Sequence, residues 1–210
     1  SGSTNVLAND NWAGDAQVSA LAGRVGAFPF SAANSRDAAL AATAVGGSYT
    51  AQLASNDAST GTALAEIYDG TPAFGANTPR LINVSARTEV TAANLLIAGF
   101  VIAGPTARTV LIRGIGPTLA SFGLRTALAD PQLTLFRDGT LVAANDHWHD
   151  AANAVAVATA AAQVGAFALA PTSRDAALLL SLPPGSYTAQ VSGANGATSG
   201  EALVEVYEVP

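Results

Sequence analysis

The residues best suited to chemistry in this chain are aspartates that gather around two tryptophans. The stretch NDNW at residues 9–12 returns as NDHW at residues 145–148, and a further aspartate follows each copy. Carboxylate and amide oxygens are the hard ligands that Ca²⁺ prefers in proteins. The stretches therefore form candidate sites for a structural calcium ion, although neither has the dense Asp spacing of a calcium-binding loop. The candidate ligands are Asp10, Asp15, Asp146 and Asp150.

The same stretches also have a purely structural interpretation. An Asx turn would close a strand at each Asn-Asp pair, and the later aspartate would cap a helix. Trp12 and Trp148 would then pack these helices onto a core; alternatively, their exposed rings would stack on a sugar. The residues alone leave these alternatives open.

Two further polar patterns accompany the tryptophans. His147 and His149 would share one face of a strand and could bind a transition metal, but the first copy has no matching histidines. The Arg-Asp pairs at residues 36–37 and 174–175 are duplicated. They predict Arg–carboxylate pairing, which could extend to Glu66 or Glu205.

Catalytic chemistry has little support in the composition. The chain contains no Cys and no Lys, and it has neither a GxSxG nor an HExxH motif. The glycine-rich stretch at residues 114–117 lacks the lysine of a phosphate-binding loop. We therefore expect a protein that is not an enzyme and that needs no cofactor beyond the structural calcium considered above.

Charge and hydropathy argue against two classes of partner. The net charge of −6 argues against nucleic acid, because phosphate binding needs a basic surface. No apolar run reaches the roughly 18 residues of a membrane-spanning helix, so we expect no membrane insertion. Without Cys or Lys, neither disulfides nor Lys–Asn isopeptide bonds can form, so any assembly is non-covalent. The chain does not begin with Met, which indicates a processed mature chain, a fragment or a trimmed polypeptide.

An internal duplication organises the chain. The stretches VGAF, SRDAAL, GSYTAQ and GTALAEIY, which begin at residues 25, 35, 47 and 61, recur or find close matches 138 or 139 residues later. Alternation of apolar and polar residues predicts strands in the duplicated part. An alanine-rich segment after each tryptophan predicts a helix, at residues 15–24 and 150–163. In the first copy, the expected strands are residues 4–8, 37–44, 48–54 and 63–68.

Residues 80–136 occur only once. They predict strands at residues 81–87, 95–103 and 109–113, and a hairpin in which Asp138-Gly139 joins residues 133–136 to 141–145. Many short strands separated by turns are typical of a β-sandwich.

The sequence therefore predicts an all-β fold of two tandem, jelly-roll-like β-sandwich units with short helical insertions. Residues 1–71 would be a truncated half-module and 72–79 a linker, with a complete module at 80–210. The first unit is incomplete because nothing in residues 1–71 matches residues 80–136.

A family resemblance accompanies these patterns. The stretches LTLFRDGTLVAANDHW, GSYTAQVSG and GEALVEVYEV resemble bacterial pre-peptidase C-terminal (PPC-like) β-sandwich domains. TVLIRGIGPTLASFGL and ALADPQLTLF resemble alanine-rich modules that are repeated near the C-termini of large secreted bacterial proteins. The resemblance covers residues 80–210 and part of residues 4–69. It implies an extracellular, non-catalytic accessory or structural module.

The incomplete first unit carries the functional expectation. A sandwich without its first strands exposes apolar side chains and unpaired backbone, which favours strand addition from another chain. The strands could also have been lost by trimming, or the short half could fold alone. The side chains expected at the interface are Leu40, Tyr49, Leu53 and Ile67.

We therefore expect a secreted structural protein that is extracellular or on the cell surface. It would self-associate as a homopolymer into a filament or surface layer. The alternative is a carbohydrate-binding or adhesive accessory module of a larger secreted protein, with a polysaccharide as its partner.

Overall fold

A computed structural model describes residues 7–75, 77–194 and 199–210 of the chain. It divides into two units, Ser1–Leu81 and Ile82–Pro210. The division falls two residues after the linker expected at residues 72–79. The two units differ sharply in regular structure, and only unit 2 contains β-sheets among the described residues.

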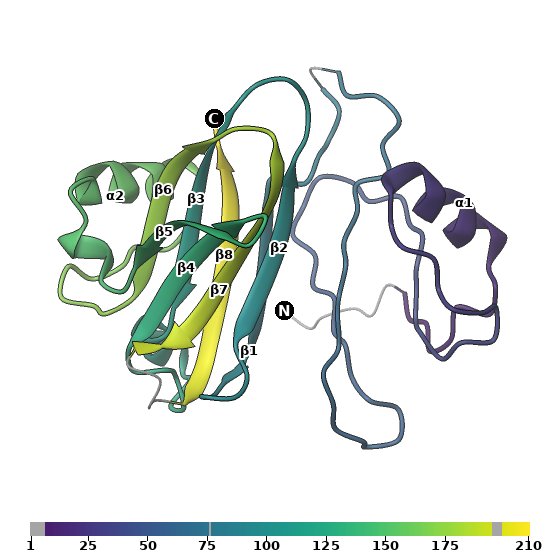
Figure 1. The fold of residues 1–210 in the computed structure, drawn as a ribbon, viewed down its shortest axis with the longest axis horizontal. Coiled ribbons are helices and arrows are strands. Elements are labelled where there is room, and N and C mark those ends of the chain that lie inside the picture. Colours follow the sequence, from purple (N-terminus) through teal and green to yellow (C-terminus); the bar gives the residue numbers. More distant parts are fainter. Residues whose placement is uncertain (1–6, 76, 195–198) are drawn as a thin grey trace. The chain divides into compact units, whose positions relative to one another are not determined.

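Unit 2 is a β-sandwich of two four-stranded antiparallel sheets, ordered β1-β8-β3-β6 and β2-β7-β4-β5 (Figure 1). The predicted all-β sandwich is thus confirmed here. The strands are β1 Asn83–Val90, β2 Leu96–Ile102, β3 Arg108–Ile115, β4 Pro131–Arg137, β5 Thr140–Asn145, β6 Ala176–Leu182, β7 Gly185–Gly193 and β8 Gly200–Val209. Its helices are α2 Ala154–Gln163 and the 3-10 helices Pro117–Phe122 and Trp148–Asp150.

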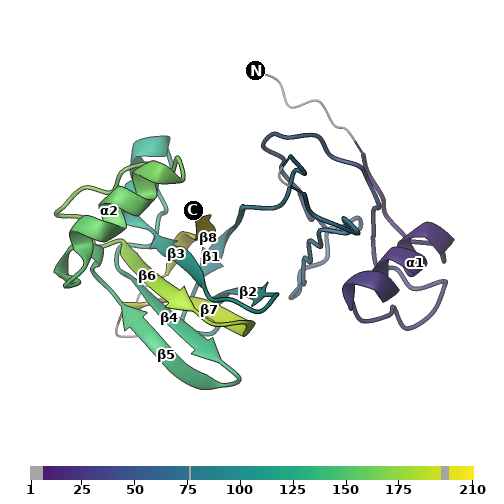
Figure 2. The same cartoon turned by 90° about the horizontal axis from the view of Figure 1, so that it is seen from above.

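The predicted alternation of side chains places the core. Along β7, Tyr187, Ala189 and Val191 are buried between the sheets, and the intervening residues are partly exposed. Most of strand β3 is buried on both faces, because it lies between the core of the sandwich and α2. Ile112 packs into the core between the sheets, and Leu111 packs into a second cluster with Trp148 and α2. Figure 2 shows α2 beside β3 and β6, away from β4 and β5.

Every ladder of the sandwich joins the first half of unit 2 to its second half. We call residues 83–137, which hold β1 to β4, the N-half, and residues 140–209, which hold β5 to β8, the C-half. The six ladders are β1–β8, β2–β7, β3–β6, β3–β8, β4–β5 and β4–β7. Within the described residues, no two strands of the same half pair with each other. Each half therefore depends on the other for its backbone hydrogen bonds.

This topology explains why unit 1 departs from the prediction. Its residues match the C-half alone, and α1 Ala16–Val25 is its only regular element among the described residues. The predicted strands at residues 37–44, 48–54 and 63–68 are irregular chain (Figure 1). These predictions were wrong because the partners of all such strands lie in an N-half. Of the strand expected at residues 4–8, residues 7 and 8 are irregular and the rest lies outside the described residues.

Both predicted helices are present, but with different caps. Asp15 caps α1, because its Oδ1 accepts from the N–H groups of Gln17 at 2.8 Å and Val18 at 3.0 Å. Helix α2 begins at residue 154, four residues later than predicted, and Asp150 does not cap it. Asp150 instead belongs to the preceding 3-10 helix.

Candidate functional site

Unit 1 reproduces local contacts of the C-half without its strands. The main-chain N–H of Trp12 donates to the carbonyl oxygen of Asp37 at 2.8 Å, and the matching bond from Trp148 to Asp175 is also 2.8 Å. Each indole Nε1–H donates to the carbonyl of an alanine that lies 20 residues later for Trp12 and 22 residues later for Trp148. The tryptophan turn is therefore determined by the C-half sequence itself.

The asparagine before each tryptophan repeats in the same way. Asn9 Oδ1 accepts from the N–H of Ala39 at 3.0 Å, and Asn145 Oδ1 accepts from the N–H of Ala177 at 2.9 Å. Each amide nitrogen donates to a carbonyl two residues later, at 3.0 Å in both copies. The NDxW stretch is thus an Asx-type turn that holds the following segment in place.

The apolar side chains that the C-half buries are exposed in unit 1. Tyr49 is 59% exposed, whereas its counterpart Tyr187 is 3% exposed; Leu53 is 60% exposed, whereas Val191 is fully buried. The four side chains expected at an interface are all more than half exposed: Leu40, Tyr49, Leu53 and Ile67. In unit 2, the ladder partners of the matching positions come from β1, β2, β3 and β4.

A buried ion pair joins the two halves of unit 2. Arg113 of β3 is fully buried, and its Nε donates to Glu205 Oε2 of β8 at 2.8 Å. Its Nη1 donates to the carbonyl oxygen of Phe167 at 2.6 Å, and its guanidinium carbon lies 4.2 Å from the centre of the Phe167 ring. Tyr207 donates its hydroxyl to Glu205 Oε1 at 2.8 Å. Burial, reinforced by the Glu205 charge, raises the pKa of Tyr207 to about 12.

A second buried carboxylate binds a turn of the N-half. Asp175 is fully buried and accepts from the N–H of Gly116 at 2.7 Å and from the hydroxyl of Thr118. Gly116 must be glycine, because a Cβ there would lie 2.1 Å from the carbonyl oxygen of Leu128. The glycine-rich stretch at residues 114–117 therefore donates a hydrogen bond to Asp175, a role that the sequence reasoning missed.

In unit 1, Glu66 matches Glu205 and Asp37 matches Asp175. Both carboxylates accept hydrogen bonds from residues close to them in the sequence. Glu66 accepts the Tyr68 hydroxyl at 3.0 Å, and Asp37 accepts the Ser35 hydroxyl at 2.7 Å. Both carboxylates are exposed. Residues 1–81 contain no counterpart of Arg113 or of the turn at residues 114–118. The candidate site, called here the acceptor residues, consists of Asp37, Leu40, Tyr49, Leu53, Glu66 and Ile67.

Arg174, one of the two duplicated arginines, pairs differently from the prediction. Arg174 Nη1 lies 3.2 Å from Asp130 Oδ2, so its partner is in the N-half rather than at Asp175 or Glu205. His147 Nε2 lies 3.5 Å from Asp130 Oδ1. His149 instead meets the Trp148 ring edge-on, with ring centres 5.3 Å apart.

Three of the four aspartates considered for calcium have structural contacts. Asp10 Oδ2 accepts from the side-chain amides of Asn11 at 2.9 Å and Asn56 at 3.1 Å. Asp15 caps α1, Asp150 Oδ2 lies 3.4 Å from His147 Nδ1, and Asp146 is exposed. Within residues 7–75, 77–194 and 199–210, no three acidic or histidine side chains are grouped to hold a metal. Calcium binding stays a prediction.

The two tryptophans differ in burial. Trp148 is 6% exposed and packs against Val157 and Ala160 of α2, which leaves no ring face for a sugar. Trp12 is partly buried, and its ring centre lies 5.1 Å from that of Phe30. Of the two alternatives for Trp148, the core position is therefore the one observed.

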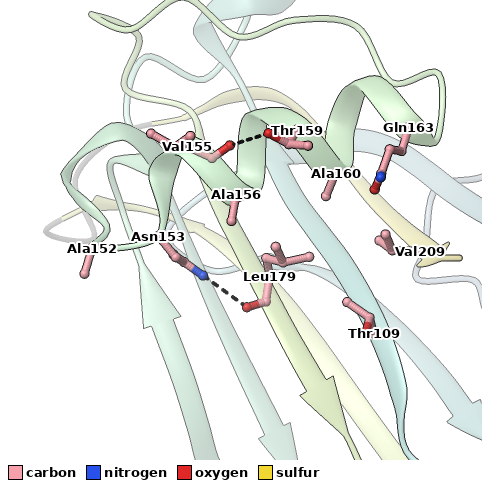
Figure 3. A pocket seen from close by; sticks show the side chains of 10 residues that line it. All are labelled: Thr109, Ala152, Asn153, Val155, Ala156, Thr159, Ala160, Gln163, Leu179 and Val209. Atoms are coloured by element: carbon pink, nitrogen blue, oxygen red, sulfur yellow. Dashed lines mark hydrogen bonds between the residues drawn. The ribbon is translucent and has the colours of Figure 1, made fainter.

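A groove of about 600 Å³ runs beside α2, over β3, β6 and β8 (Figure 3). Its lining is mainly alanine, valine and leucine, without a titratable side chain. The polar groups of Asn153 and Thr159 bond to main-chain carbonyls, at 3.3 Å to Leu179 and 2.9 Å to Val155. This groove offers no acid, base or charge for catalysis.

Comparisons with known proteins give a distant structural likeness. No protein-family model and no curated protein matches the chain. None of the helices in the described part of the chain has the length and apolar character needed to cross a bilayer. Among solved structures, the chain is similar to the pre-peptidase C-terminal domain of a collagenase from Bacillus anthracis. The identity is 12% and the TM-score 0.35, over 62% of this chain and 98% of that domain.

Proposed function

We propose that the chain is a non-catalytic structural protein, secreted or displayed on the cell surface, that assembles by strand complementation. Unit 1 is the acceptor: it takes up an N-half from another polypeptide and closes into a second sandwich. One observation supports this proposal above all. Every ladder of unit 2 joins an N-half strand to a C-half strand, so a C-half alone has no ladder to form.

Closure of unit 1 would be favoured by burial of its exposed apolar side chains and by new backbone hydrogen bonds. Burying an apolar side chain the size of Leu53 or Ile67 contributes about 1.5–3 kcal/mol. Ladders to the incoming strands would also satisfy the backbone of residues 37–44, 48–54 and 63–68. Association and ordering of the chains oppose this gain, so closure needs a well-matched partner.

The partner must bring an N-half that is not already paired. Residues 1–210 hold two C-half sequences but one N-half. A neighbour that gave up its own residues 83–137 would open its own unit 2, so exchange between copies closes no additional sandwich. Exchange of N-halves between copies of residues 1–210 therefore cannot by itself build the expected homopolymer. Polypeptides with an unpaired N-half at one end and a C-half at the other would add head to tail, which yields a filament or layer.

The proposal is tested by coexpressing the full chain with a separate polypeptide of residues 80–137. We expect a one-to-one complex in which the amides of residues 37–68 become protected from hydrogen exchange. In a second arm, the same 80–137 sequence is fused ahead of Ser1. If the amides were protected in the fusion but not with the separate polypeptide, even at high concentration, closure would occur only within one polypeptide. That result would refute assembly between chains. Protection in neither arm would refute the acceptor role itself.

A further inference from the structure

Resting on that proposed function, we infer that unit 1 recognises its incoming N-half through two carboxylates, Glu66 and Asp37. Glu66 pairs with an arginine of the incoming strand. Asp37 binds the N–H and hydroxyl groups of the turn that follows. The partner is therefore a polypeptide whose strand ends in the pattern Arg-Gly-x-Gly-Pro-Thr, as at residues 113–118 of this chain.

The pattern follows from the way unit 2 uses the same carboxylates. Glu205 and Asp175 match Glu66 and Asp37, and each contacts the N-half at one end of β3. Arg113 lies within that strand and binds Glu205, while Gly116 and Thr118, just beyond it, bind Asp175. The two contacts together fix the position of β3 along β8 and β6.

In unit 1, Glu66 is held ready for such an arginine. Tyr68 donates to Glu66 Oε1, as Tyr207 donates to Glu205 Oε1. In unit 2 the remaining oxygen, Oε2, accepts from Arg113. Glu66 is exposed, so an incoming arginine can reach its carboxylate.

The end of α1 adds a second point of contact for the arginine. Gly26 ends α1 in the left-handed conformation with φ 75°, and Gly165 follows α2 with φ 71°. The chain then leads to Phe28 and Phe167, respectively. Phe167 supplies the carbonyl and the ring that contact Arg113. Phe28, the counterpart of Phe167, is exposed, and we expect its ring and carbonyl to contact the incoming guanidinium.

The carboxylates also provide selectivity. A strand that carried an apolar residue at the arginine position would bury Glu66 without a cation, and an uncompensated buried charge is strongly unfavourable. The exposed apolar acceptor residues would accept many β segments, whereas the charge rejects those that lack the arginine. Apolar burial thus contributes affinity without selectivity, and the pairing of Glu66 with an arginine contributes the selectivity.

The absence of cysteine permits a clean test of register. In unit 2, Ile112 is the register partner of Val206, whose counterpart in unit 1 is Ile67. The full chain with Ile67→Cys, coexpressed with residues 80–137 carrying Ile112→Cys, should form one disulfide-linked complex. Leu111→Cys in the added polypeptide is the control, because the neighbouring residue faces the other side of the strand.

Substitutions of the carboxylates and of the arginine are then compared for binding in the same pair of polypeptides. Glu66→Gln or Asp37→Asn in the full chain, or Arg113→Gln in the added polypeptide, should weaken binding at least tenfold. Asp57→Asn, which changes a carboxylate in an exposed loop of unit 1, should leave binding unchanged. Glu66→Arg combined with Arg113→Glu in the added polypeptide should restore part of the lost affinity.

The outcomes separate this inference from the proposed function. Cross-linking that is unaffected by Glu66→Gln and Asp37→Asn would leave complementation standing and overturn recognition by the carboxylates. Equal cross-linking by the Ile112→Cys and Leu111→Cys polypeptides would overturn the register. An absence of both cross-linking and amide protection with the unmodified carboxylates would overturn the proposed function.

Discussion

Tyr187 and Tyr49 make the same hydrogen bond in opposite surroundings. Each donates its hydroxyl to the carbonyl oxygen four residues earlier, at 2.8 Å for Tyr187 and 3.0 Å for Tyr49. Tyr187 also stacks on Phe100 of β2, with ring centres 5.4 Å apart, whereas Tyr49 is mainly exposed. The local conformation of the tyrosine is thus determined within the C-half, and its burial depends on the N-half.

Trp148→Ala should lower the free energy of unfolding of unit 2 by about 3–5 kcal/mol, as for other buried aromatic side chains. The loss follows from its packing against α2 and its indole hydrogen bond. Trp12→Ala is the matched control, and its effect should be much smaller because unit 1 has no closed sandwich. Denaturant unfolding of each variant, followed by circular dichroism, measures both values. Equal losses would contradict the difference between the units.

Glu205→Gln should destabilise unit 2 by about 3–5 kcal/mol, because it leaves the fully buried Arg113 without its counter-charge. Glu66→Gln should leave stability unchanged, since Glu66 is exposed. The double variant Arg113→Met with Glu205→Leu removes both charges and should recover much of the loss. A double variant as unstable as Glu205→Gln would show that the packing, and not the charge, dominates.

Alkaline pH should weaken unit 2 through Tyr207. Burial raises its pKa from 10.0 to about 12, so the folded state holds the phenol proton more tightly than the unfolded state. This contribution is complete below about pH 10 and is lost as pH rises toward 12. Unfolding free energies measured across this window should fall less steeply for Tyr207→Phe than for the unmodified protein. Identical slopes would contradict the raised pKa.

Gly116→Ala should destabilise unit 2 by about 1–3 kcal/mol or more, because its Cβ would overlap the Leu128 carbonyl. The shift would also disturb the bond from Gly116 to Asp175. Gly99→Ala of β2 is the control, because the nearest atom would lie 3.9 Å away. That substitution should be neutral or slightly stabilising. Thermal unfolding of both variants distinguishes the two outcomes.

Removal of Ca²⁺ should change the melting temperature little. Asp15 already caps α1, and Asp10 already accepts two side-chain amides, so a bound ion would act only as an added stabiliser. Melting curves in the presence of a chelator and of millimolar calcium measure the difference. A large drop with the chelator would show that these aspartates hold an essential ion.

Much of unit 2 could be predicted from its sequence because the relevant signals are local. The alternation around Tyr187 placed β7, and Asp138-Gly139 placed the turn between β4 and β5, where both residues have positive φ. The same alternation in residues 48–54 predicted a strand that is absent from unit 1. Periodicity reports which side chains could be buried, but a strand exists only where another strand pairs with it.

The contacts of the candidate site were harder to predict because they span long distances in the chain. Arg113 and Glu205 are 92 residues apart, and Gly116 and Asp175 are 59 apart. The duplicated Arg174 drew attention as a partner for Glu205, whereas the actual partner lies in the part that occurs once. One signal in the sequence could have pointed to these partners. Glu205 and Asp175 are duplicated, but residues that pair with them can lie in the part of the chain that occurs once.

The separation of partners also has a consequence for how unit 2 folds during synthesis. The turn between β4 and β5 is the one hairpin that links consecutive strands in the described residues, and β1 pairs with β8, so that Asn83 meets Tyr207. A ribosome would therefore release β1, β2 and β3 long before their partners exist. Such long-range pairing slows folding and leaves the early strands exposed to aggregation. Unit 2 can close only when β8, Gly200–Val209, has emerged, which makes synthesis of this strand the step that commits unit 2 to fold.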